Sequence, residues 1–390
     1  MNILFLLRTL GTGGVTVVSS ALANKFSTEG HKVYAFYFQD GSSSIANRFD
    51  ERVELVKGYG YSVNKKNIKL LRRILIEKHI EVIINQWGLP LIPIHTALKA
   101  SKKLDVKIIS IYHNAPSFNG RIQTINIQLS KCKNPVKQII LKAKREVFKY
   151  VTSMAMRYIY KKSDMFFVLS ESYKDEFSRF TGVKDIRKLD VMTNPVTIDT
   201  TGFVYHEGLK EKEIIYIGRL DFVQKRVHRI IETWNYIEEQ FPDWHLTIVG
   251  DGEDRANLEN YTLVLGLKHV TFEGFKPPID YYKRSSILLL TSDFEGFPLV
   301  LAESMSFGVI PMVYHTFAAV DDIIEDGKDG IIIPYSPDGF KAEETSHKLS
   351  MLMKNNNQRN KMAIAAIKKS HNFSIDKIYQ EWMIKLEQIN

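Results

Sequence analysis

Short apolar runs alternate along this chain with longer segments whose apolar residues recur every three or four positions. In the first half, buried strands are predicted at 3–7, 32–38, 82–84, 106–111 and 165–169. Between the first two runs, residues 15–25 have helical spacing and follow a turn that contains Gly11, Gly13 and Gly14. A strand, a helix and a second strand in this order predict a parallel α/β sheet.

The alternation stops at Asn194-Pro195-Val196 and restarts after the polar stretch 197–212. In the second half, strands are predicted at 213–217, 245–249, 270–272, 287–290, 308–314 and 331–334. The last segment, 374–390, has the pattern of an amphipathic helix. The sequence therefore predicts an α/β protein of two domains, 1–195 and 196–373.

Composition agrees with two packed domains, since the chain has 390 residues and 44% of them are apolar. Cys132 is the only cysteine, which excludes an intramolecular disulfide and suits a reducing compartment. The apolar run at 3–7 is too short for a signal peptide, and no run reaches the roughly 18–20 residues that span a bilayer. We expect a soluble, cytoplasmic protein.

Two carboxylates, Glu295 and Glu303, flank a predicted strand-to-helix turn. Gly296 frees the backbone there, and Pro298 suits the first turn of a helix. The free N–H groups of a helix start favour an anion such as a phosphate, while a carboxylate accepts hydrogen bonds from sugar hydroxyls. A nucleotide-sugar has this order of groups: ribose, diphosphate, hexose. The alternative is a surface glutamate before a helix and a second one on its solvated face.

Further motifs precede these carboxylates in a fixed order. They are Gly218-Arg219-Leu220 with Lys225, Gly250-Asp251-Gly252-Glu253, and Phe272-Glu273-Gly274. Together with the early glycine turn and Asn194-Pro195-Val196, they make the chain resemble the retaining glycosyltransferases of family four, which have the GT-B fold. The resemblance covers nearly the whole chain and is strongest at about 213–335.

The resemblance implies two facing Rossmann-like domains with a cleft between them. The first would bind the acceptor and the second the nucleotide-sugar donor, and the helix at 374–390 would cross back to the first domain. It also implies a transfer that retains the configuration at the sugar C1. The departing phosphate would help to deprotonate the acceptor hydroxyl, so we assign no nucleophile.

By the same resemblance, Arg219 and Lys225 contact the diphosphate and stabilise the charge of the leaving group, as a metal does elsewhere. No Asp-x-Asp follows a strand, and we expect no metal site. The family often has its lysine five positions after the arginine, where this chain has Gln224. Lys225 comes one position later, with Arg226 as a possible substitute. The alternative for Arg219 and Lys225 is solvated surface charge.

The other donor-binding residues follow from the resemblance too. Glu303 would bind the ribose hydroxyls, and Glu295 would bind the donor sugar or lie beside its anomeric carbon. Phe275 would flank the base, or else pack in the core. The donor would also be lined by Gly252, Gly296, Phe297, Pro298 and Leu299.

In the first domain, His113 follows a predicted strand, and ligands bind at that edge of open α/β sheets. In the family, a histidine near this place faces the donor sugar; a structural histidine is the alternative. Gly13 and Gly14 do not complete a dinucleotide fingerprint. They would let the backbone approach the donor or acceptor, or simply form a tight turn.

Charge is unevenly distributed, with a net +17 in residues 1–195 and −8 in 196–390. Residues 131–162 hold ten Lys or Arg and one acidic residue, Glu146, with apolar residues interleaved. This pattern predicts one or two basic amphipathic helices on an anionic membrane surface. The alternative is a packed helix with a solvated basic face. No nucleic-acid-binding motif accompanies the charge, so no nucleic-acid partner is expected.

The favoured function is transfer of a hexose from a nucleotide-sugar to a glycan or lipid-linked acceptor in bacterial cell-surface polysaccharide synthesis. A UDP-sugar is favoured over a GDP-sugar, and no separate cofactor is expected. One alternative is another enzyme of the same architecture, a nucleotide-sugar epimerase or a phosphorylase. The other is a non-enzymatic, basic peripheral membrane protein, which leaves the motifs of the second half unexplained. The basic segment 131–162 leads us to expect that the cytoplasmic protein associates with the inner face of the plasma membrane.

Overall fold

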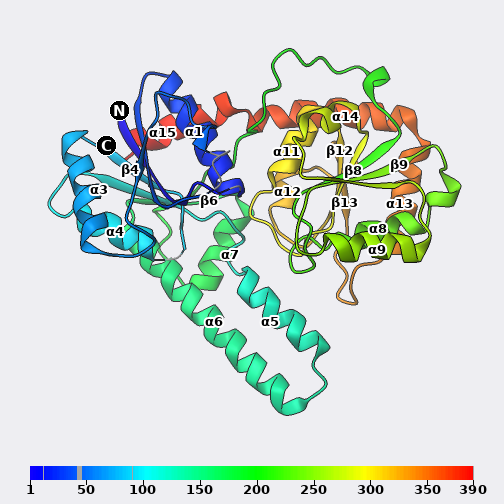
Figure 1. Ribbon diagram of the computed structural model, residues 1–390, viewed down its shortest axis with the longest axis horizontal. Coiled ribbons are helices and arrows are strands. Elements are labelled where there is room, and N and C mark those ends of the chain that lie inside the picture. Colours follow the sequence, from blue (N-terminus) through cyan, green and yellow to red (C-terminus); the bar gives the residue numbers. More distant parts are fainter. Residues whose placement is uncertain (12, 42–45, 90, 390) are drawn as a thin grey trace. The chain divides into compact units, whose positions relative to one another are not determined.

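Parallel strands form two separate sheets in the computed structural model of the protein, which describes residues 1–389 except 12, 42–45 and 90 (Figure 1). Each sheet belongs to its own compact unit. Unit 1 comprises Met1–Thr197 and Phe373–Asn390, and unit 2 comprises Ile198–Asn372. The predicted α/β class with two Rossmann-like sheets is confirmed.

The sheet of unit 1 has the order β3-β2-β1-β4-β5-β6-β7. Its strands are β1 (Asn2–Thr9), β2 (Lys32–Gln39), β3 (Glu54–Lys57), β4 (Val82–Asn85), β5 (Lys107–Ile111), β6 (Met165–Val168) and β7 (Leu189–Val191). Leu4 of β1 lies between Tyr34 of β2 and Ile83 of β4. The strand order reverses between β1 and β4, and such a switch point is where open α/β sheets bind ligands.

Helices cover this sheet and connect its strands. They are α1 (Gly14–Thr28), α3 (Lys65–Glu77), α4 (Ile92–Ala100), α5 (Gly120–Lys131), α6 (Pro135–Lys162), α7 (Ser172–Thr181) and α15 (Ile375–Glu387). The chain reaches α15 only after leaving unit 2, yet α15 packs on α1. Trp382 is fully buried there, with its ring 6.2 Å from Phe26 and 5.3 Å from Phe167. The predicted C-terminal helix is confirmed.

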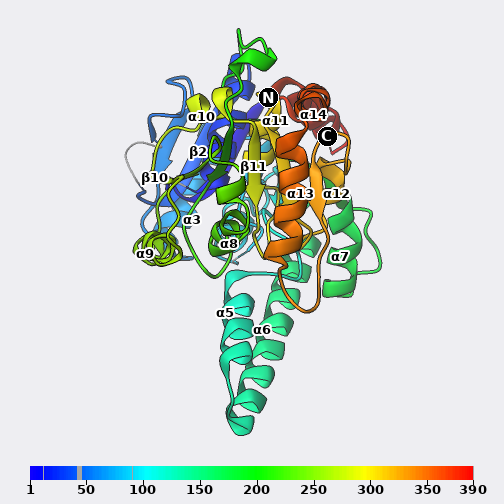
Figure 2. The same ribbon diagram turned by 90° about the vertical axis from the view of Figure 1, so that its right-hand side faces the viewer.

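Helices α5 and α6 form a hairpin that projects from the sheet of unit 1 (Figures 1 and 2). Asn119 and Asn134 cap the two helices by accepting backbone N–H groups. The 28 residues of α6 correspond to about 42 Å of helix. Within the described ranges, no helix combines the length and the apolar character needed to cross a bilayer.

The sheet of unit 2 has the order β10-β9-β8-β11-β12-β13. Its strands are β8 (Glu213–Ile217), β9 (His245–Val249), β10 (Val270–Gly274), β11 (Ile287–Leu290), β12 (Ile310–Tyr314) and β13 (Ile331–Ile333). The order reverses between β8 and β11, which pair through Ile214 and Ile287. Unit 2 therefore has its own switch point, equivalent in topology to that of unit 1.

The helices of unit 2 alternate with its strands. They are α8 (His228–Asn235), α9 (Arg255–Leu265), α10 (Ile279–Arg284), α11 (Leu299–Ser306), α12 (Val320–Ile323), α13 (Ala342–Lys354) and α14 (Asn356–Ser370). The four residues of β11 are all buried, as the unbroken apolar run predicts for a central parallel strand.

Three details differ from the sequence predictions. Strands β3 and β7 at the edges of the first sheet were missed, because partly polar strands lack a continuous apolar run. The strand predicted from residue 308 begins at Ile310, since Gly308 has a φ of +71° and follows the end of α11. Helix α11 starts at Leu299, with Pro298 in the N-cap position.

Candidate functional site

Two loops meet at the switch point of unit 2, one after β8 and one after β11. The backbone N–H of Asp293 donates to the carbonyl of Gln224 at 2.8 Å. The Gln224 side-chain amide donates to the Phe294 carbonyl at 3.0 Å. Because the two strands are neighbours, their carboxyl ends bring both loops to the same edge of the sheet.

Lys225 and Glu295 form an ion pair between these loops. The Lys225 Nζ donates to Glu295 Oε1 at 2.6 Å, and the Gln224 Nε2 donates to Glu295 Oε2 at 3.3 Å. Glu295 is 6% exposed. A buried carboxylate is costly unless a charge and hydrogen bonds compensate it, and the amine and amide supply both. The later position of Lys225 therefore still brings its amine to Glu295, and a contact with the diphosphate stays a prediction.

Arg219 is held at the same place by two residues that the sequence analysis missed. Its Nε donates to Asp221 Oδ2 at 2.7 Å, and an outer nitrogen donates to Gln224 Oε1 at 3.1 Å. Burial by itself would raise the pKa of Asp221, but the backbone N–H of Gln224 and the Arg219 guanidinium together lower it. The Arg219 side chain stays 62% exposed, so it can contact a ligand.

Arg226 is engaged elsewhere. Its Nε donates to Asp293 Oδ2 at 2.7 Å, and Arg229 pairs with the other oxygen of Asp293 at 2.6 Å. Arg226 has a φ of +55°, a left-handed backbone conformation at the end of the loop. The structure thus places Lys225, and not Arg226, beside Glu295.

The glycines of the β9 loop have a packing role. A Cβ at Gly250 would lie 1.8 Å from the Gly218 carbonyl oxygen, and one at Gly252 would lie 2.2 Å from the Leu220 oxygen. Only glycine permits this backbone contact, which holds the segment around Arg219 in place. A contact of Gly252 with the donor stays a prediction.

Glu303 and Phe275 differ sharply in exposure. Glu303 is 6% exposed on α11, and its Oε2 accepts the Tyr282 hydroxyl at 3.3 Å, so it does not lie on a solvated helix face. Phe275 follows β10 and is 79% exposed, so it is not a core aromatic. Between them in sequence, Gly296, Phe297 and Pro298 are buried in the connection that leads to Leu299. Their contacts with a donor stay predictions.

Unit 1 contains a cavity of about 990 Å³ at its own switch point. Arg8 of β1, Gln86 and Trp87 after β4, and His113 after β5 line it on the sheet side. The α6 hairpin helix contributes its other wall, with Phe148, Val151, Thr152 and Ala155. His113 was predicted at this edge, whereas Arg8, Gln86 and Trp87 were missed, although each lies at the end of a predicted strand.

His113 is neutral in the cavity wall. Burial lowers its pKa to about 4, and Asn194 opposes that shift without completing a hydrogen bond to Nδ1. Nε2 lies 2.6 Å from Gln86 Oε1, which accepts, so Nε2 carries the proton. The other nitrogen, Nδ1, is buried without a partner and is available as an acceptor.

Gly13 and Gly14 are exposed at the start of α1, next to Val15 of the cavity lining. Gly13 has an ordinary extended conformation, with φ −75° and ψ 155°, and a Cβ there would meet nothing within 4 Å. Neither backbone strain nor crowding requires glycine at position 13. A contact of Gly13 and Gly14 with a donor or acceptor stays a prediction.

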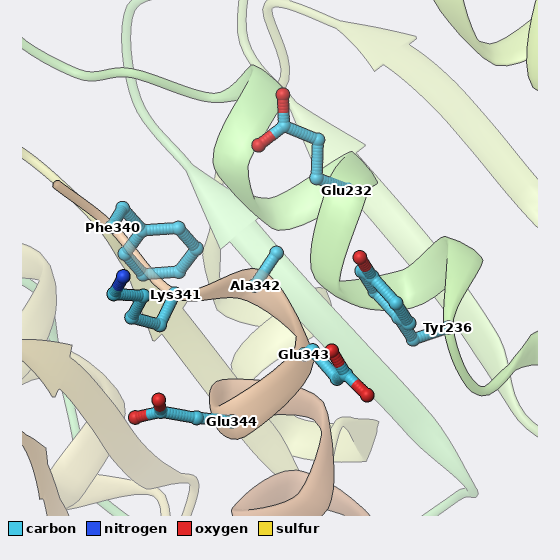
Figure 3. A pocket seen from close by; sticks show the side chains of 7 residues that line it. All are labelled: Glu232, Tyr236, Phe340, Lys341, Ala342, Glu343 and Glu344. Carbon is cyan, nitrogen blue, oxygen red and sulfur yellow. The ribbon is translucent and has the colours of Figure 1, made fainter. Parts of the chain in front are cut away.

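Unit 2 contains a cavity of about 500 Å³ between α8 and the start of α13 (Figure 3). Glu232, Glu343 and Glu344 line it, and their carboxylates do not converge on one point (Figure 3). None of the predicted site residues belongs to it. In the part of the chain that the structure describes, no three His, Cys, Asp or Glu side chains are grouped to hold a metal.

Sequence profiles of known families match both units. The profile described as Glycosyltransferase Family 4 matches residues 12–200, and that described as Glycosyl transferases group 1 matches residues 198–369. An uncharacterized glycosyltransferase of Haemophilus influenzae is 25% identical over 387 residues, which are 97% of both chains.

Another full-length relative comes from Campylobacter jejuni. It is an alpha-1,4-N-acetyl-D-galactosaminyltransferase named for the glycan GalNAc-alpha-(1->4)-GalNAc-alpha-(1->3)-diNAcBac-PP-undecaprenol, and it is 25% identical over 100% of this chain and 99% of its own.

Solved structures share the fold over the whole chain. Anabaena HepE in complex with UDP-glucose has a TM-score of 0.74 at 16% identity, with 100% of both chains covered. The pneumococcal O-GlcNAc transferase GtfA in complex with UDP and GlcNAc has a TM-score of 0.76 at 11% identity, covering 100% of this chain and 99% of its own.

Proposed function

Because this chain belongs to the group 1 glycosyltransferases of family 4 and has the GT-B fold, we propose which sugar transfer it carries out. The donor is a hexose on a nucleoside diphosphate, and the acceptor is a glycan or a lipid-linked glycan. The configuration at C1 is retained, and the product belongs to a bacterial cell-surface polysaccharide. Family membership favours this transfer over epimerisation or phosphorolysis.

One observation carries the proposal: the arrangement of Arg219, Lys225 and Glu295 at the switch point of unit 2. Two cations and one buried carboxylate lie within a network whose bonds measure 2.6–3.3 Å, bridged by Gln224. A diphosphate needs cations, and a hexose needs a hydrogen-bond acceptor. This cluster supplies both kinds of group to one ligand.

The chemistry follows from where charge appears. As the bond between C1 and the phosphate oxygen breaks, its electron pair goes to the diphosphate. Arg219 and Lys225 stabilise that growing negative charge, without a metal. The acceptor oxygen attacks C1 from the face that the phosphate leaves, and its proton goes to the departing phosphate oxygen. Glu295 binds the donor sugar beside the anomeric carbon, and Glu303 binds the ribose hydroxyls.

We propose a UDP-sugar as donor. Two of the solved structures with this fold hold UDP, one as UDP-glucose and one beside GlcNAc, which supports uridine at low sequence identity. Exposed Phe275 offers its face to the base, and Gly13, where a Cβ would meet nothing within 4 Å, permits a close approach to the backbone in unit 1.

The experiment is a thermal-shift screen of the full chain against UDP-, GDP- and ADP-sugars, followed by NMR of the product. We expect UDP-sugars to raise the melting temperature and the product to keep the anomeric configuration of the donor. EDTA should leave turnover unchanged. A protein that binds no nucleotide-sugar, or a product of inverted configuration, would contradict the proposal.

We also propose that the α5–α6 hairpin rests on an anionic membrane surface close to a lipid-linked acceptor. Large apolar side chains are exposed along α6, with Ile139 at 67% and Val147 at 61%. Residues 131–162 also hold ten Lys or Arg. A helix that is both apolar and basic on its exposed surface suits the interface of anionic lipids. The C. jejuni relative, named for an undecaprenol-linked glycan, is consistent with such an acceptor.

Co-sedimentation with vesicles tests this hairpin. Wild-type protein should pellet with phosphatidylglycerol vesicles at low salt and much less with phosphatidylcholine vesicles. The double variant Ile139→Glu, Ile140→Glu should stay in solution. A matched control is Leu263→Glu, Val264→Glu, which changes two neighbouring exposed residues of α9 in unit 2 and should still pellet. Equal pelleting of both double variants would exclude the hairpin as the contact.

A further inference from the structure

The cavity of unit 1 concentrates side-chain polar atoms that have no partner. Among the described residues, eight buried side-chain nitrogens or oxygens lack a hydrogen bond, and four of them belong to residues that line this cavity. They are Arg8 Nε, Gln86 Nε2, Trp87 Nε1 and His113 Nδ1. Buried polar groups are normally paired with protein, water or a ligand, so a cluster of unpaired ones around a cavity makes the cavity a candidate binding site.

Among these residues, Gln86 gives the strongest evidence of a binding site because it is only 1% exposed. Its Oε1 is occupied by His113 at 2.6 Å, while both hydrogens of its Nε2 stay unused. Burying an amide without a partner costs more free energy than a typical hydrogen bond contributes. A ligand that accepts hydrogen bonds removes this penalty.

Charge narrows the class of ligand. Arg8 and Arg121 line the cavity, and neither has an ion-pair or hydrogen-bond partner among the described residues. The described lining contains no Asp or Glu. Arg8 is half-buried and Arg121 is exposed, so both guanidinium groups can pair with an anionic ligand.

Arg8 is also held in position. Its guanidinium carbon lies 4.7 Å from the centre of the Tyr61 ring and 5.9 Å from that of Trp87. Stacking on aromatic rings restricts the side chain, so that less entropy is lost when the planar group binds an anion. Backbone packing fixes the Trp87 loop, since a Cβ at Gly88 would lie 2.6 Å from the Ile111 carbonyl oxygen.

We propose that this cavity binds an anionic group of the acceptor, the carboxylate of a sugar acid or a phosphate, through Arg8, with Gln86 and Trp87 donating to the attached sugar. This assignment rests on the proposed glycosyl transfer, because it is the acceptor that unit 1 would take. Phe148 and Val151 provide the apolar wall against which a sugar ring packs. The protein therefore selects charged acceptors over neutral ones.

Ligand-observed NMR with the full chain tests the charge preference. The probes are glucuronate and glucose, which differ by one carboxylate, inorganic pyrophosphate against sulfate at equal ionic strength, and UDP. Wild-type protein should bind glucuronate or pyrophosphate at least tenfold more tightly than its matched probe. The anion that shows the preference identifies the source of the charge.

Substitutions show which residue causes the preference for anions. Arg8→Gln should abolish it, Arg8→Lys should keep part of it, and Trp87→Phe should weaken glucose and glucuronate equally. Arg179→Gln, an exposed arginine of α7 outside the cavity, should behave as wild type. UDP affinity should stay within twofold throughout.

The inference is overturned if wild type shows no preference for the anions, or if Arg8→Gln retains it. A tenfold loss of UDP affinity in Arg8→Gln would assign this guanidinium to the donor and would also overturn it. Failure of the proposed glycosyl transfer would give a different result, because wild-type protein would then bind no UDP at all.

Discussion

The two units have sheets of the same topology, but their switch points are built in opposite ways. In unit 2, the charged residues are paired with one another: Lys225 with Glu295, Arg219 with Asp221, and Arg226 with Asp293. In unit 1, Arg8 has no counter-ion among the described residues, and neighbouring donors are unpaired.

This difference indicates how each site would bind its ligand. A paired network is pre-organised and keeps its geometry when empty, which suits chemistry at a fixed atom. An unpaired cluster is completed only by a ligand, which suits the recognition of one class of acceptor. In the proposals above, equivalent edges of the two sheets therefore carry two different tasks.

The strongest test of the paired network is Glu295→Gln, which keeps the size of the side chain and removes its charge. Turnover of a UDP-sugar should fall about 100- to 1000-fold, because the group beside the reacting centre is lost. The matched control is Glu343→Gln in the cavity of Figure 3, which should keep full activity. Turnover within threefold of wild type would show that Glu295 does not act in the transfer.

His113 offers a test of unit 1 through pH. Its pKa is about 4 in the folded protein and ordinarily about 6.5, so between these values the unfolded chain binds the extra proton. The contribution of His113 to the free energy of unfolding is fully present near pH 7. It falls by about 3 kcal/mol in all as the pH drops below both pKa values.

Urea unfolding of wild type and His113→Gln at pH 7 and pH 4.5 measures that loss. The variant should lose less stability on acidification than wild type. His228, whose pKa burial also lowers to about 4, contributes equally to both proteins and cancels in the difference. Identical losses in the two proteins would exclude a buried neutral His113.

Glu303→Gln separates donor binding from folding. Alanine would leave a cavity at this buried position, whereas glutamine preserves the volume. We expect the affinity for UDP to fall about tenfold or more, since a charged acceptor of the ribose hydroxyls becomes a neutral one. Calorimetric titration with UDP measures this. Exposed Glu344→Gln should match wild type, and unchanged affinity in Glu303→Gln would refute the ribose assignment.

The smallest effect is expected from Phe275→Ala. Loss of a face for the base should weaken UDP binding about two- to tenfold. Because Phe275 is 79% exposed, the free energy of unfolding should change by about 0.5 kcal/mol or less. Tyr236→Ala, at the cavity of Figure 3, is the control for loss of an exposed ring. A larger change in stability than in UDP affinity would contradict the role.

Much of the fold was predictable from apolar periodicity. The central strands β1, β4, β8 and β11 are buried on both faces, so their runs are continuous and easily recognised. The edge strands β3 and β7 were not, because partial exposure permits polar residues in them. Of the site, the motif residues Arg219, Lys225 and Glu295 were identified and are grouped in the structure.

Gln224 and Asp221 were not recognised as site residues, although Gln224 bonds to both Arg219 and Glu295. Their importance comes from contacts across a loop, which a linear pattern does not display. The same holds for Arg8, Gln86 and Trp87, whose strand-end positions were visible but whose lack of partners was not.

The sequence by itself determined the class of the protein, because burial of parallel strands and the ordered glycine and carboxylate motifs leave a direct record in residue types. Only the tertiary structure decided which charges are paired and which have no partner among the described residues. Pairing depends on side chains that are distant in sequence, since Lys225 and Glu295 lie 70 positions apart, and the folding of a whole sheet brings such residues together.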